Sequence, residues 1–595
     1  MKVKLFLLFL ILKTLKSEKI LDLNEKIKPP SKTDSSSSIY NIVIMGTNDI
    51  HGAYFPKEIT YPDLKEKKKK TYKSGGLTYM GKYISILREE WGERFLWLDA
   101  GDQFQGGLES RISDNNIIID FFNIMKLNAS TVGNHEWDYG IDVLQDKINR
   151  ANYFYIIDNI KNGTNNNKKV FQKQYITKIF KVGKVKIGVI GLVTIKTPNK
   201  STADFKNIKF LDYKQIIIEE SRKLRKETDI ILLLSHFGIE CYKQSLKERN
   251  TYNIYSKKDK FTECDDNEEL YSVLEYLTTK EVDVIVSGHT HFNVHQFFND
   301  IPVISNLNDG KNFHLMYLNF KQNKNGKLTF LPNETLIEGP IPICEKIFEK
   351  TLRCDEMTSQ EIMKSGELYK YKFHNVLIEE EPKLFELTNY WEKKYIEYTS
   401  EILTSTDNLL EHTYCIENPL SNFILDSLRI ITNADIAILN SGTFKTKWNI
   451  GKISVANIYQ MMPFESDVVT FKINGLNLKK LIKSIQSSKN ALYPISGLKQ
   501  IVFKKGNKYG LISFKIYDGF IEKEVDDNKI YTIVTNNYCY PFGGGGFKKF
   551  VKWFKGNWVN HGDIRDLMIN YLKEIPSIVT DNYYDPNNPR MKYLY

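Results

Sequence analysis

Short polar motifs follow directly after strand-like apolar runs at several points in the first half of this 595-residue chain. The apolar runs at 42–45, 95–98, 230–234 and 282–286 are each followed within a few residues by a loop that carries Asp or His. Short runs rich in Val, Ile and Leu are typical of buried strands. In layered α/β folds, the loops that leave neighbouring strands gather at one edge of the sheet. The pattern therefore predicts an α/β fold with one polar site at a sheet edge.

These polar motifs contain side chains that bind metals or move protons, and five of the ten histidines of the chain lie in them. The motifs are Asp49-Ile50-His51, Gly101-Asp102, Gly133-Asn134-His135-Glu136, Trp137-Asp138, Ser235-His236, Gly288-His289 and Thr290-His291. Imidazole nitrogens suit Zn, Fe, Mn or Ni, and carboxylate and amide oxygens suit harder ions, so the metal identity stays open. Two divalent cations roughly 3.5–4 Å apart can clamp a phosphoryl group. A shared carboxylate offsets the repulsion between them, and Asp102 in its glycine-flanked loop is the natural candidate.

The order of these motifs resembles that of the calcineurin-like metallophosphoesterases. The sequences at 133–138 and 288–291 look like those of the 5'-nucleotidase and UDP-sugar hydrolase branch, and the resemblance runs from about Asn41 to Asp566. It implies a dinuclear site whose ligands are Asp49, His51 and His291 for one ion, Asn134, His236 and His289 for the other, and Asp102 for both. His135 would be catalytic rather than a ligand, oriented by Asp138. It would stabilise the charge that develops on the phosphoryl group during in-line attack.

Each motif alone has a simpler explanation, because a lone Asn-His or His-x-His is usually a loop or a satisfied core histidine. The ordered set of motifs favours the metal site over this alternative. The other five histidines match no ligand position and are interpreted as surface or packing residues: His295, His314, His374, His412 and His561.

The length of the chain suggests roughly two to four domains, and a hydrophobic content of 42% supports globular folding. The resemblance implies an N-terminal metallophosphoesterase-like sandwich of two sheets flanked by helices, joined to an α/β C-terminal nucleotide-recognition domain. Apolar spacing predicts helices at 79–88, 213–226 and 384–403. We expect a signal peptide at 1–17, a flexible leader at 18–40, the metallophosphoesterase domain at 41–340, an interdomain connection at 341–383 and the C-terminal substrate-recognition domain at 384–595.

Substrate selectivity has to come from the second half of the chain, because metals that clamp phosphate hardly distinguish one phosphate ester from another. The resemblance places Asn440 and Lys445 at positions used for substrate contact. It also places Tyr493 and Tyr538 where aromatic rings stack on the base. A single aromatic residue in a loop is as often a packing residue, so a packing role is the alternative for each of these two tyrosines.

Three positions in the second half depart from the family pattern. Lys445 stands where the family has Arg, which replaces a rigid bidentate donor by a flexible point charge. Tyr414 stands where another phosphate-binding Arg is expected, and Gly545 where an acidic residue normally contacts the ribose hydroxyls. These departures weaken the prediction of nucleotide specificity more than the prediction of catalysis.

The net charge of +11 comes mainly from lysines spread along the chain, so we expect no nucleic-acid partner. Lys2 and Lys4 before the apolar stretch at 5–12 are typical of a secretory signal peptide, and an uncleaved signal anchor is the alternative. Later apolar runs are shorter than a transmembrane helix requires. We therefore expect a secreted, extracellular protein without a transmembrane anchor after signal removal.

The six cysteines of a secreted chain can all form disulfides, although sequence alone does not fix their connectivity. Proximity along the chain suggests Cys241 with Cys264 and Cys344 with Cys354, which leaves Cys415 with Cys539. Unpaired buried thiols are the alternative if the chain is not secreted.

These observations predict a secreted dinuclear-metal hydrolase that converts nucleoside 5'-monophosphates to nucleoside and phosphate, with two divalent ions such as Zn or Mn. One alternative keeps the metals and changes the substrate to a nucleotide sugar, a cyclic nucleotide or another phosphate ester. Another is a catalytically silent secreted protein that binds nucleotides, although an unused site would be expected to lose ligands. The oligomeric state and protein partners stay open.

Overall fold

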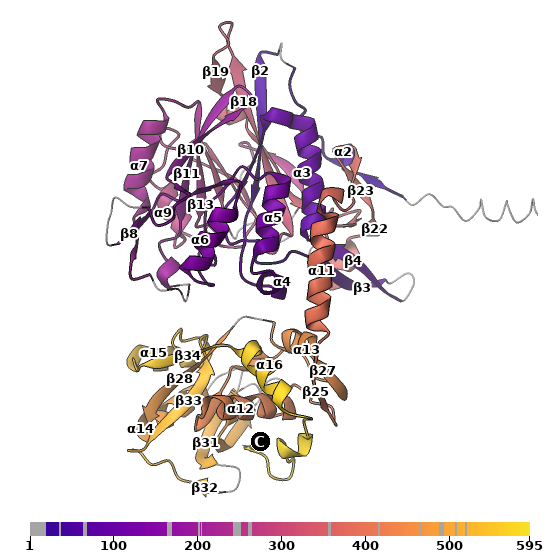
Figure 1. The fold of residues 1–595 in the computed structure, drawn as a ribbon. Coiled ribbons are helices and arrows are strands. Elements are labelled where there is room, and N and C mark those ends of the chain that lie inside the picture. Colours follow the sequence, from indigo (N-terminus) through magenta and orange to yellow (C-terminus); the bar gives the residue numbers. More distant parts are fainter. Residues whose placement is uncertain are drawn as a thin grey trace, which may run out of the picture. The chain divides into compact units, whose positions relative to one another are not determined.

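The computed structural model describes the chain except for residues 1–18, 35–36, 64–67, 164–168, 200, 202, 204, 242–250, 260–263, 355–356, 358, 414–416, 464–465, 487–492, 506–507, 518–520 and 595. The predicted signal peptide and Tyr414 lie outside the described residues. The chain divides into two compact units, one up to Lys393 and the other from Lys394, both visible in Figure 1.

Two sheets form the centre of the first unit (Figure 1). One has nine strands, in the order β14-β20-β18-β2-β5-β6-β7-β9 with β19 paired to β18, and the other has six, in the order β10-β11-β13-β15-β17-β16. The nine strands are β2 (Ile39–Thr47), β5 (Phe95–Asp99), β6 (Ala129–Ser130), β7 (Phe154–Ile156), β9 (Gln174–Tyr175), β14 (Asn253–Ser256), β18 (Asn312–Gln322), β19 (Leu328–Phe330) and β20 (Leu336–Pro342). The six are β10 (Thr177–Val182), β11 (Val185–Val193), β13 (Ile230–His236), β15 (Val284–Ser287), β16 (Val294–Phe298) and β17 (Ile301–Ser305).

The central strands carry apolar side chains on both faces, and this pattern produces the layers. In β2, Ile42 and Ile44 pack between the two sheets, whereas Val43 and Met45 point to the outer face. The helices that cover the outer faces are α3 (Leu77–Trp91), α5 (Asn116–Met125) and α6 (Ile141–Arg150) on the nine-stranded sheet, and α7 (Tyr213–Leu224) and α9 (Glu269–Leu274) on the six-stranded sheet. The fold is the predicted two-sheet sandwich flanked by helices.

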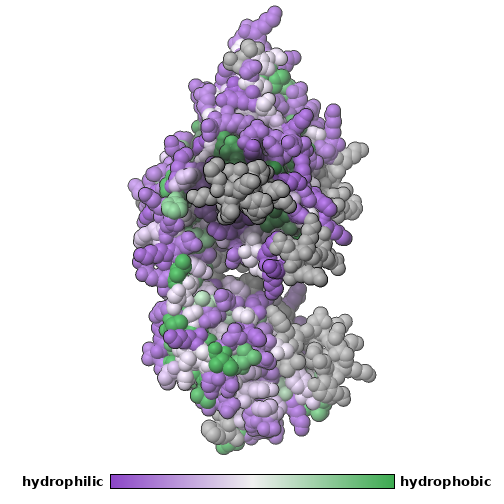
Figure 2. Space-filling model, turned by 90° about the vertical axis from the view of Figure 1, so that its right-hand side faces the viewer, coloured by the Kyte–Doolittle hydropathy of each residue, from purple (hydrophilic) through white to green (hydrophobic). Residues whose placement is uncertain are grey.

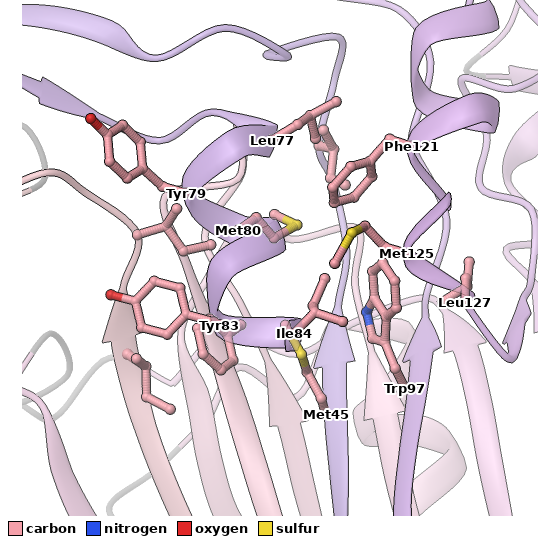
Figure 3. Close-up of a cluster of buried hydrophobic side chains, with 14 of the residues drawn as sticks. Met45, Leu77, Tyr79, Met80, Tyr83, Ile84, Trp97, Phe121, Met125 and Leu127 are labelled. Carbon is pink, nitrogen blue, oxygen red and sulfur yellow. The ribbon is translucent and has the colours of Figure 1, made fainter. Parts of the chain in front are cut away.

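Figure 3 shows how α3 and α5 pack on the nine-stranded sheet. Met80 and Ile84 of α3 face Met125 of α5, and Met45 and Trp97 rise toward them from the strands below. All five side chains are buried, and burying each large apolar side chain contributes roughly 1.5–3 kcal/mol. This packing fixes strands β2 and β5, whose carboxyl ends carry predicted site residues.

The three predicted helices are present with shifted ends. The helices predicted at 79–88 and 213–226 are α3 and α7, at Leu77–Trp91 and Tyr213–Leu224. The helix predicted at 384–403 is α11 (Phe385–Thr399), and the chain then continues as strand β25 (Ile402–Thr406). The shorter helix has a local reason, because the β-branched residues of Ile402–Thr406 favour a strand.

The second unit has a five-stranded sheet in the order β29-β26-β33-β28-β34, and a four-stranded sheet in the order β32-β31-β30-β35. The first sheet consists of β26 (Ile436–Ile438), β28 (Asp467–Asn474), β29 (Ile495–Ser496), β33 (Ile530–Asn536) and β34 (Trp558–Asp563). The second consists of β30 (Leu498–Lys505), β31 (Lys508–Tyr517), β32 (Glu522–Lys523) and β35 (Met591–Leu594). The helices on the five-stranded sheet are α12 (Pro419–Thr432), α13 (Val455–Met461) and α16 (Ile564–Glu574) on one face, and α14 (Gly475–Ile485) and α15 (Lys548–Trp553) on the other. This is the predicted α/β architecture.

Two segments outside 41–340 also pack on the first unit. Leu23, in the predicted flexible leader, is buried, and strand β1 (Leu21–Asp22) pairs with β23 (Tyr371–Phe373). Strand β23 lies in the predicted interdomain connection, yet Tyr371 and Phe373 belong to the same core as helix α3. Apolar residues in these two segments therefore extend the core of the first unit.

Two disulfides join predicted cysteine pairs, Cys241 with Cys264 and Cys344 with Cys354. Both pairs lie in the first unit. Cys415, the predicted partner of Cys539, lies outside the described residues. Cys539 itself is buried and forms no disulfide with a described residue.

Hydrophilic residues predominate on the face of the molecule in Figure 2, and hydrophobic residues form small separate groups there. Within the described parts of the chain, no helix combines the length and the apolar character needed to cross a bilayer.

The side chain of His374 is only 5% exposed and forms ion pairs in the first unit. Its Nδ1 lies 2.5 Å from Oε2 of Glu90, and its Nε2 lies 3.8 Å from Oε2 of Glu338. Glu338 is fully buried and also accepts hydrogen bonds from the hydroxyls of Tyr252 and Tyr317. Burial lowers the pKa of His374, but the two nearby carboxylates outweigh burial and raise this pKa to about 9.

We expect His374→Gln to destabilise the chain by about 2–3 kcal/mol in neutral and mildly acidic solution. The folded pKa of His374 is above the ordinary value, so its stabilising effect is complete below about pH 6.5 and is lost as the pH rises through about 9. Thermal unfolding of both proteins across this range should show a melting-temperature difference that shrinks as the pH rises. A constant difference would show that His374 acts through packing alone.

Candidate metal centre

The predicted ligands lie at the carboxyl ends of strands from both sheets. Strands β2, β5 and β6 run parallel in the nine-stranded sheet, and β13 and β15 run parallel in the six-stranded sheet. In the nine-stranded sheet, Asp49 and His51 follow β2, Asp102 follows β5 and Asn134 follows β6. In the six-stranded sheet, His236 ends β13, and His289 and His291 follow β15. The two sheets thus bring together seven residues that are spread over more than two hundred positions of sequence.

Five of these seven residues have a left-handed backbone conformation. Their φ angles are 52° for Asp49, 48° for His51, 52° for Asp102, 83° for His289 and 57° for His291. Residues other than glycine rarely adopt positive φ, and each such residue costs on the order of 1–3 kcal/mol. Strain that recurs at the predicted ligands, and is held there by the surrounding fold, is typical of a functional site.

Two glycines allow the loops after β5 and β6 to touch. A Cβ atom on Gly133 would lie 2.1 Å from Oδ1 of Asp102, and one on Gly101 would lie 2.5 Å from the backbone nitrogen of Gly133. Both distances are shorter than atoms can approach. Any side chain at either glycine would therefore push Asp102 away from its neighbours.

Asp49, His51 and His291 form the first ligand group, with ligand atoms within 4.8 Å of one another. The Nε2 atoms of the two histidines lie 3.0 Å apart. Oδ1 of Asp49 lies 3.6 Å from Nε2 of His51 and 3.4 Å from Nε2 of His291. Burial opposes ionisation of Asp49, but the two nearby histidines hold its pKa well below the usual range. The group thus presents two imidazole nitrogens and one carboxylate to the same point.

Asp102, His236 and His289 form the second group, whose ligand atoms also lie within 4.8 Å of one another. Nδ1 of His236 lies 2.7 Å from the carbonyl oxygen of Ala100, which can only accept, so Nδ1 donates. In the neutral ring Nε2 then carries a lone pair, yet it lies 2.9 Å from Oδ2 of Asp102. Two acceptors repel at this distance unless a proton or a metal ion lies between them. The backbone bond to Ala100 orients the ring in the way that metal-binding histidines are usually oriented.

Three buried polar atoms of the site have no hydrogen-bond partner among the described residues: Oδ1 of Asp49, Oδ1 of Asn134 and Nε2 of His236. An unpaired buried polar atom costs roughly 1–3 kcal/mol, so these atoms indicate a ligand. Asp102 of the second group also approaches the first, because its Oδ2 lies 2.9 Å from Nε2 of His236 and 3.8 Å from Nε2 of His51. The donor set fits two divalent cations that share Asp102.

His135 lies beside the first group and is held by Asp138. Its Nδ1 is 2.6 Å from Oδ2 of Asp138, and its ring centroid is 5.3 Å from that of His51. The backbone nitrogen of His135 also donates to Oδ1 of Asp102 at 2.8 Å. Burial lowers the pKa of His135, but the charge of Asp102 and the bond to Asp138 outweigh burial and raise this pKa to about 9. The partly exposed imidazole can therefore donate a hydrogen bond to an anion.

Glu136 has a role that the motif did not reveal. Its fully buried carboxylate accepts four backbone N–H groups, from Asp102 at 2.9 Å, Gln103 at 2.6 Å, Phe104 at 3.1 Å and Gly133 at 2.5 Å. Hydrogen bonds to an ionised group are stronger than neutral ones. Glu136 thus joins the loop that carries Asp102 to the loop after β6. The only signal in the sequence was an acidic residue in a ligand motif that had no ligand position of its own.

Asn48 is a second residue whose role the sequence motifs did not indicate. Its Nδ2 donates to Oδ2 of Asp49 at 2.5 Å and to the carbonyl oxygen of Asn306 at 3.1 Å. The backbone nitrogen of His289 also donates to Oδ2 of Asp49, at 2.9 Å. These bonds saturate one carboxylate oxygen, so the other, Oδ1, faces His51 and His291.

The second unit contains the four predicted substrate-contact residues. Oδ1 of Asn440 accepts hydrogen bonds from Oγ1 of Thr443 at 2.9 Å and from Nδ2 of Asn536 at 3.0 Å. Lys445 is exposed, and its backbone nitrogen donates to the carbonyl oxygen of Met461 at 2.8 Å. The structure thus shows a firmly held amide and an exposed amino group, and their contact with substrate stays a prediction.

The two predicted stacking tyrosines differ in exposure. Tyr538 is 50% exposed, and its ring lies against Gly544, where a Cβ atom would come within 2.4 Å. Tyr493 is only 5% exposed, and its hydroxyl accepts the N–H group of Gly546 at 2.7 Å. It also lines a cavity with Ser441 and Phe444. Tyr538 is thus half-exposed and Tyr493 is buried at the wall of this cavity, and base contact by either tyrosine stays a prediction.

Comparison with known families agrees with this geometry. Residues 42–293 match the family model of calcineurin-like phosphoesterases, and residues 398–552 match that of the 5'-nucleotidase C-terminal domain. The chain belongs to the 5'-nucleotidase family of metallophosphoesterases. The predicted family is confirmed, and this 5'-nucleotidase family member is a phosphoric ester hydrolase.

Relatives of this family member match it over most of the length of both chains. A 5'-nucleotidase-related protein of Glossina morsitans morsitans is 24% identical over 571 residues, which cover 90% of this chain and 92% of the relative. An apyrase of Tabanus yao is 22% identical over 586 residues, which cover 92% and 93%. Among solved structures, a putative 5'-nucleotidase from Staphylococcus aureus has a TM-score of 0.62 at 19% identity and covers 93% of this chain and 99% of its own. The fold of both units is therefore that of the family.

Proposed function

We propose that this chain is a secreted dinuclear-metal 5'-nucleotidase that hydrolyses nucleoside 5'-monophosphates to nucleoside and phosphate. One observation carries this proposal: two ligand groups meet at Asp102, which belongs to the second group and lies 3.8 Å from His51 of the first, and His135 and Asp138 lie beside them. Phosphoryl transfer requires little covalent chemistry from the protein, and catalysis comes from positioning and from stabilising charge. The site has the side chains for both tasks.

The residues of the chain have distinct tasks in this proposal. The seven ligands would hold two divalent ions such as Zn or Mn, which polarise phosphoryl oxygens and lower the pKa of a bound water. Asp138 orients the imidazole of His135 through Nδ1, which leaves Nε2 to donate to a phosphate oxygen. Because charge on those oxygens changes during in-line attack, this donor stabilises the transition state.

Support for a nucleotide substrate comes from the second unit and from the relatives. The 5'-nucleotidase C-terminal domain covers residues 398–552, and Asn440, Lys445, Tyr493 and Tyr538 lie within it. Asn440 and Lys445 are proposed to hold phosphate or sugar, and Tyr538 and Tyr493 to contact the base. Secretion is supported by the two disulfides, which persist in oxidising compartments.

A second candidate keeps the metal site and changes the substrate. Lys445 and Gly545 replace residues that the family uses for phosphate and ribose, which favours a nucleotide sugar, a cyclic nucleotide or another phosphate ester. Some relatives are named apyrases, so nucleoside di- and triphosphates belong to the same comparison. A catalytically silent nucleotide-binding protein is disfavoured, because all seven ligand positions carry competent side chains.

The decisive experiment is a substrate screen on purified chain that has been stripped of metal and reconstituted with Mn or Zn. We expect phosphate release from AMP and related monophosphates to be fastest, and to stop when a chelator is added. Faster release from UDP-glucose, a cyclic nucleotide or ATP would replace the 5'-nucleotidase proposal by the second candidate. Nucleotide binding without hydrolysis under any metal would overturn both.

A further inference from the structure

Helices α14 and α15 form one outer face of the second unit. Both contribute to the apolar cluster on one side of the five-stranded sheet, through residues such as Leu481 and Phe550, whereas α12, α13 and α16 pack on the opposite side. Figure 1 shows α14 and α15 on one side of strands β28 and β33, and α12 and α16 on the other. The outward side chains of α14 and α15 therefore share one surface.

This surface is basic. No Asp or Glu occurs between residues 468 and 517 or between residues 528 and 562, the segments that contain α14, α15 and the start of β34. Lys480 of α14 and Lys548, Lys549 and Lys552 of α15 are exposed. None of these four lysines forms an ion pair with a described residue. Their positive charges are thus not neutralised locally, although solvated lysines usually have acidic neighbours on a mixed surface.

Two tryptophans lie among these lysines. Trp553 is 46% exposed at the end of α15, and Nζ of Lys480 lies 5.7 Å from the centroid of its ring. Trp558 is 41% exposed and is paired across strands with Phe471. Paired residues point to the same side of a sheet, and the ring of Phe471 packs 5.7 Å from that of Phe550 in α15. Trp558 therefore points to the α15 side of the sheet.

We propose that this basic-aromatic face, formed by Lys480, Lys548, Lys549, Lys552, Trp553 and Trp558, binds the surface of an anionic phospholipid membrane. Lysines attract lipid phosphates and are effective within a Debye length of the surface. Indole rings favour the headgroup level, where the apolar ring is buried and the N–H group stays hydrated. The chain would then be a peripheral protein that lies on a membrane through its second unit.

The mixture of residues distinguishes a membrane from a soluble polyanion. Lysines alone would serve a sulfated polysaccharide or a nucleic acid equally well. Two exposed indoles on the same face gain more from the apolar boundary of a bilayer than from a hydrated polymer. The charged groups that face this surface from α14, α15 and the first residues of β34 are all basic, so an anionic headgroup would meet no repulsive carboxylate on these elements.

The test uses the full chain and vesicles of phosphatidylcholine with or without phosphatidylserine, with binding measured by co-sedimentation. We expect binding only to the anionic vesicles, with a blue shift of tryptophan fluorescence. The variant K480E/K552E should bind roughly tenfold or more weakly. Its matched control, K324E/K327E, changes the same charge at two exposed lysines next to β19 in the first unit and should bind nearly as the parent does. Phosphate release from AMP serves as the check that each variant is folded.

A Trp553→Ser variant tests the contribution of the indole ring to membrane binding separately from that of the lysine charges. We expect it to retain attraction to anionic vesicles but to bind several-fold more weakly, with a smaller blue shift. Equal losses in K480E/K552E and K324E/K327E would show that only net charge matters and would overturn the proposed face. No vesicle binding by the parent chain, or binding to heparin or single-stranded RNA without binding to vesicles, would also overturn it. Parent-like binding and blue shift in Trp553→Ser would remove the indole from the proposal.

Discussion

His135→Ala is expected to lower turnover of a nucleoside monophosphate by roughly 10²–10⁴-fold, with two metal ions still bound. The imidazole lies beside the first ligand group, and its Nδ1 is 2.6 Å from Oδ2 of Asp138. It is not part of either ligand group. Its removal should therefore affect the transition state and leave metal binding intact. Steady-state phosphate release and metal analysis of the same preparation measure both effects.

Two further variants identify the cause of that loss. Asp138→Asn keeps the imidazole of His135 but removes the carboxylate that orients it, so we expect a smaller loss of turnover. His561→Ala removes a histidine of strand β34 in the second unit and should leave turnover nearly unchanged. Normal turnover in His135→Ala would remove His135 from the mechanism, and loss of metal from that variant would mean that it is a ligand.

Glu136→Gln is expected to weaken metal binding by roughly 10–100-fold and to lower turnover at limiting metal. Glutamine has the same size, but it carries no charge and keeps one acceptor oxygen in place of two. Four backbone N–H groups bind the native carboxylate, so at least some would lose their partner and the loop of Asp102 would shift. Titration with Mn, followed by phosphate release, measures both the affinity and the rate.

The metal titration distinguishes a loss of the positioning of the Asp102 loop by Glu136 from a general loss of folding. Because Glu136 is buried and bonds to backbone groups alone, we expect the KM for substrate at saturating metal to stay near the parent value while kcat falls. Glu109→Gln neutralises another acidic side chain, on the neighbouring helix α4 (Leu108–Ile112), and is the matched control. If both variants have parent-like metal affinity, Glu136 does not hold the Asp102 loop in the way described.

The strands of the first unit were predictable because strand-like apolar runs are local signals, whereas their arrangement as two sheets was implied by the resemblance to a known family. Val43 and Met45 alternate with Ile42 and Ile44 in β2, and each set packs on its own side of the sheet. The metal-binding motifs were predictable for the same reason, since each follows a run of this kind. The resemblance to a known family then assigned roles to these motifs, which periodicity alone could not do.

Other features depend on contacts between distant residues and have no local signal. The bonds from Glu136 to Gln103 and Phe104 join two separate loops. Nothing near Tyr371 in the sequence indicates that it completes the core around helix α3. The basic-aromatic face was also hidden, because its lysines come from two helices about seventy residues apart and appeared in the sequence as charge scattered along the chain.

The ligands of the candidate site come from both sheets of the first unit, and this origin has a consequence for variation in the protein. The spacing of the two ligand groups is set by how the two sheets pack against each other. A Cβ atom at Gly46 in β2 would lie 2.7 Å from Ile304 and 2.9 Å from Val286, which belong to the opposite sheet. Enlarging such an interior position would shift one sheet relative to the other and alter the distance between the two ligand groups, although no ligand residue had been changed.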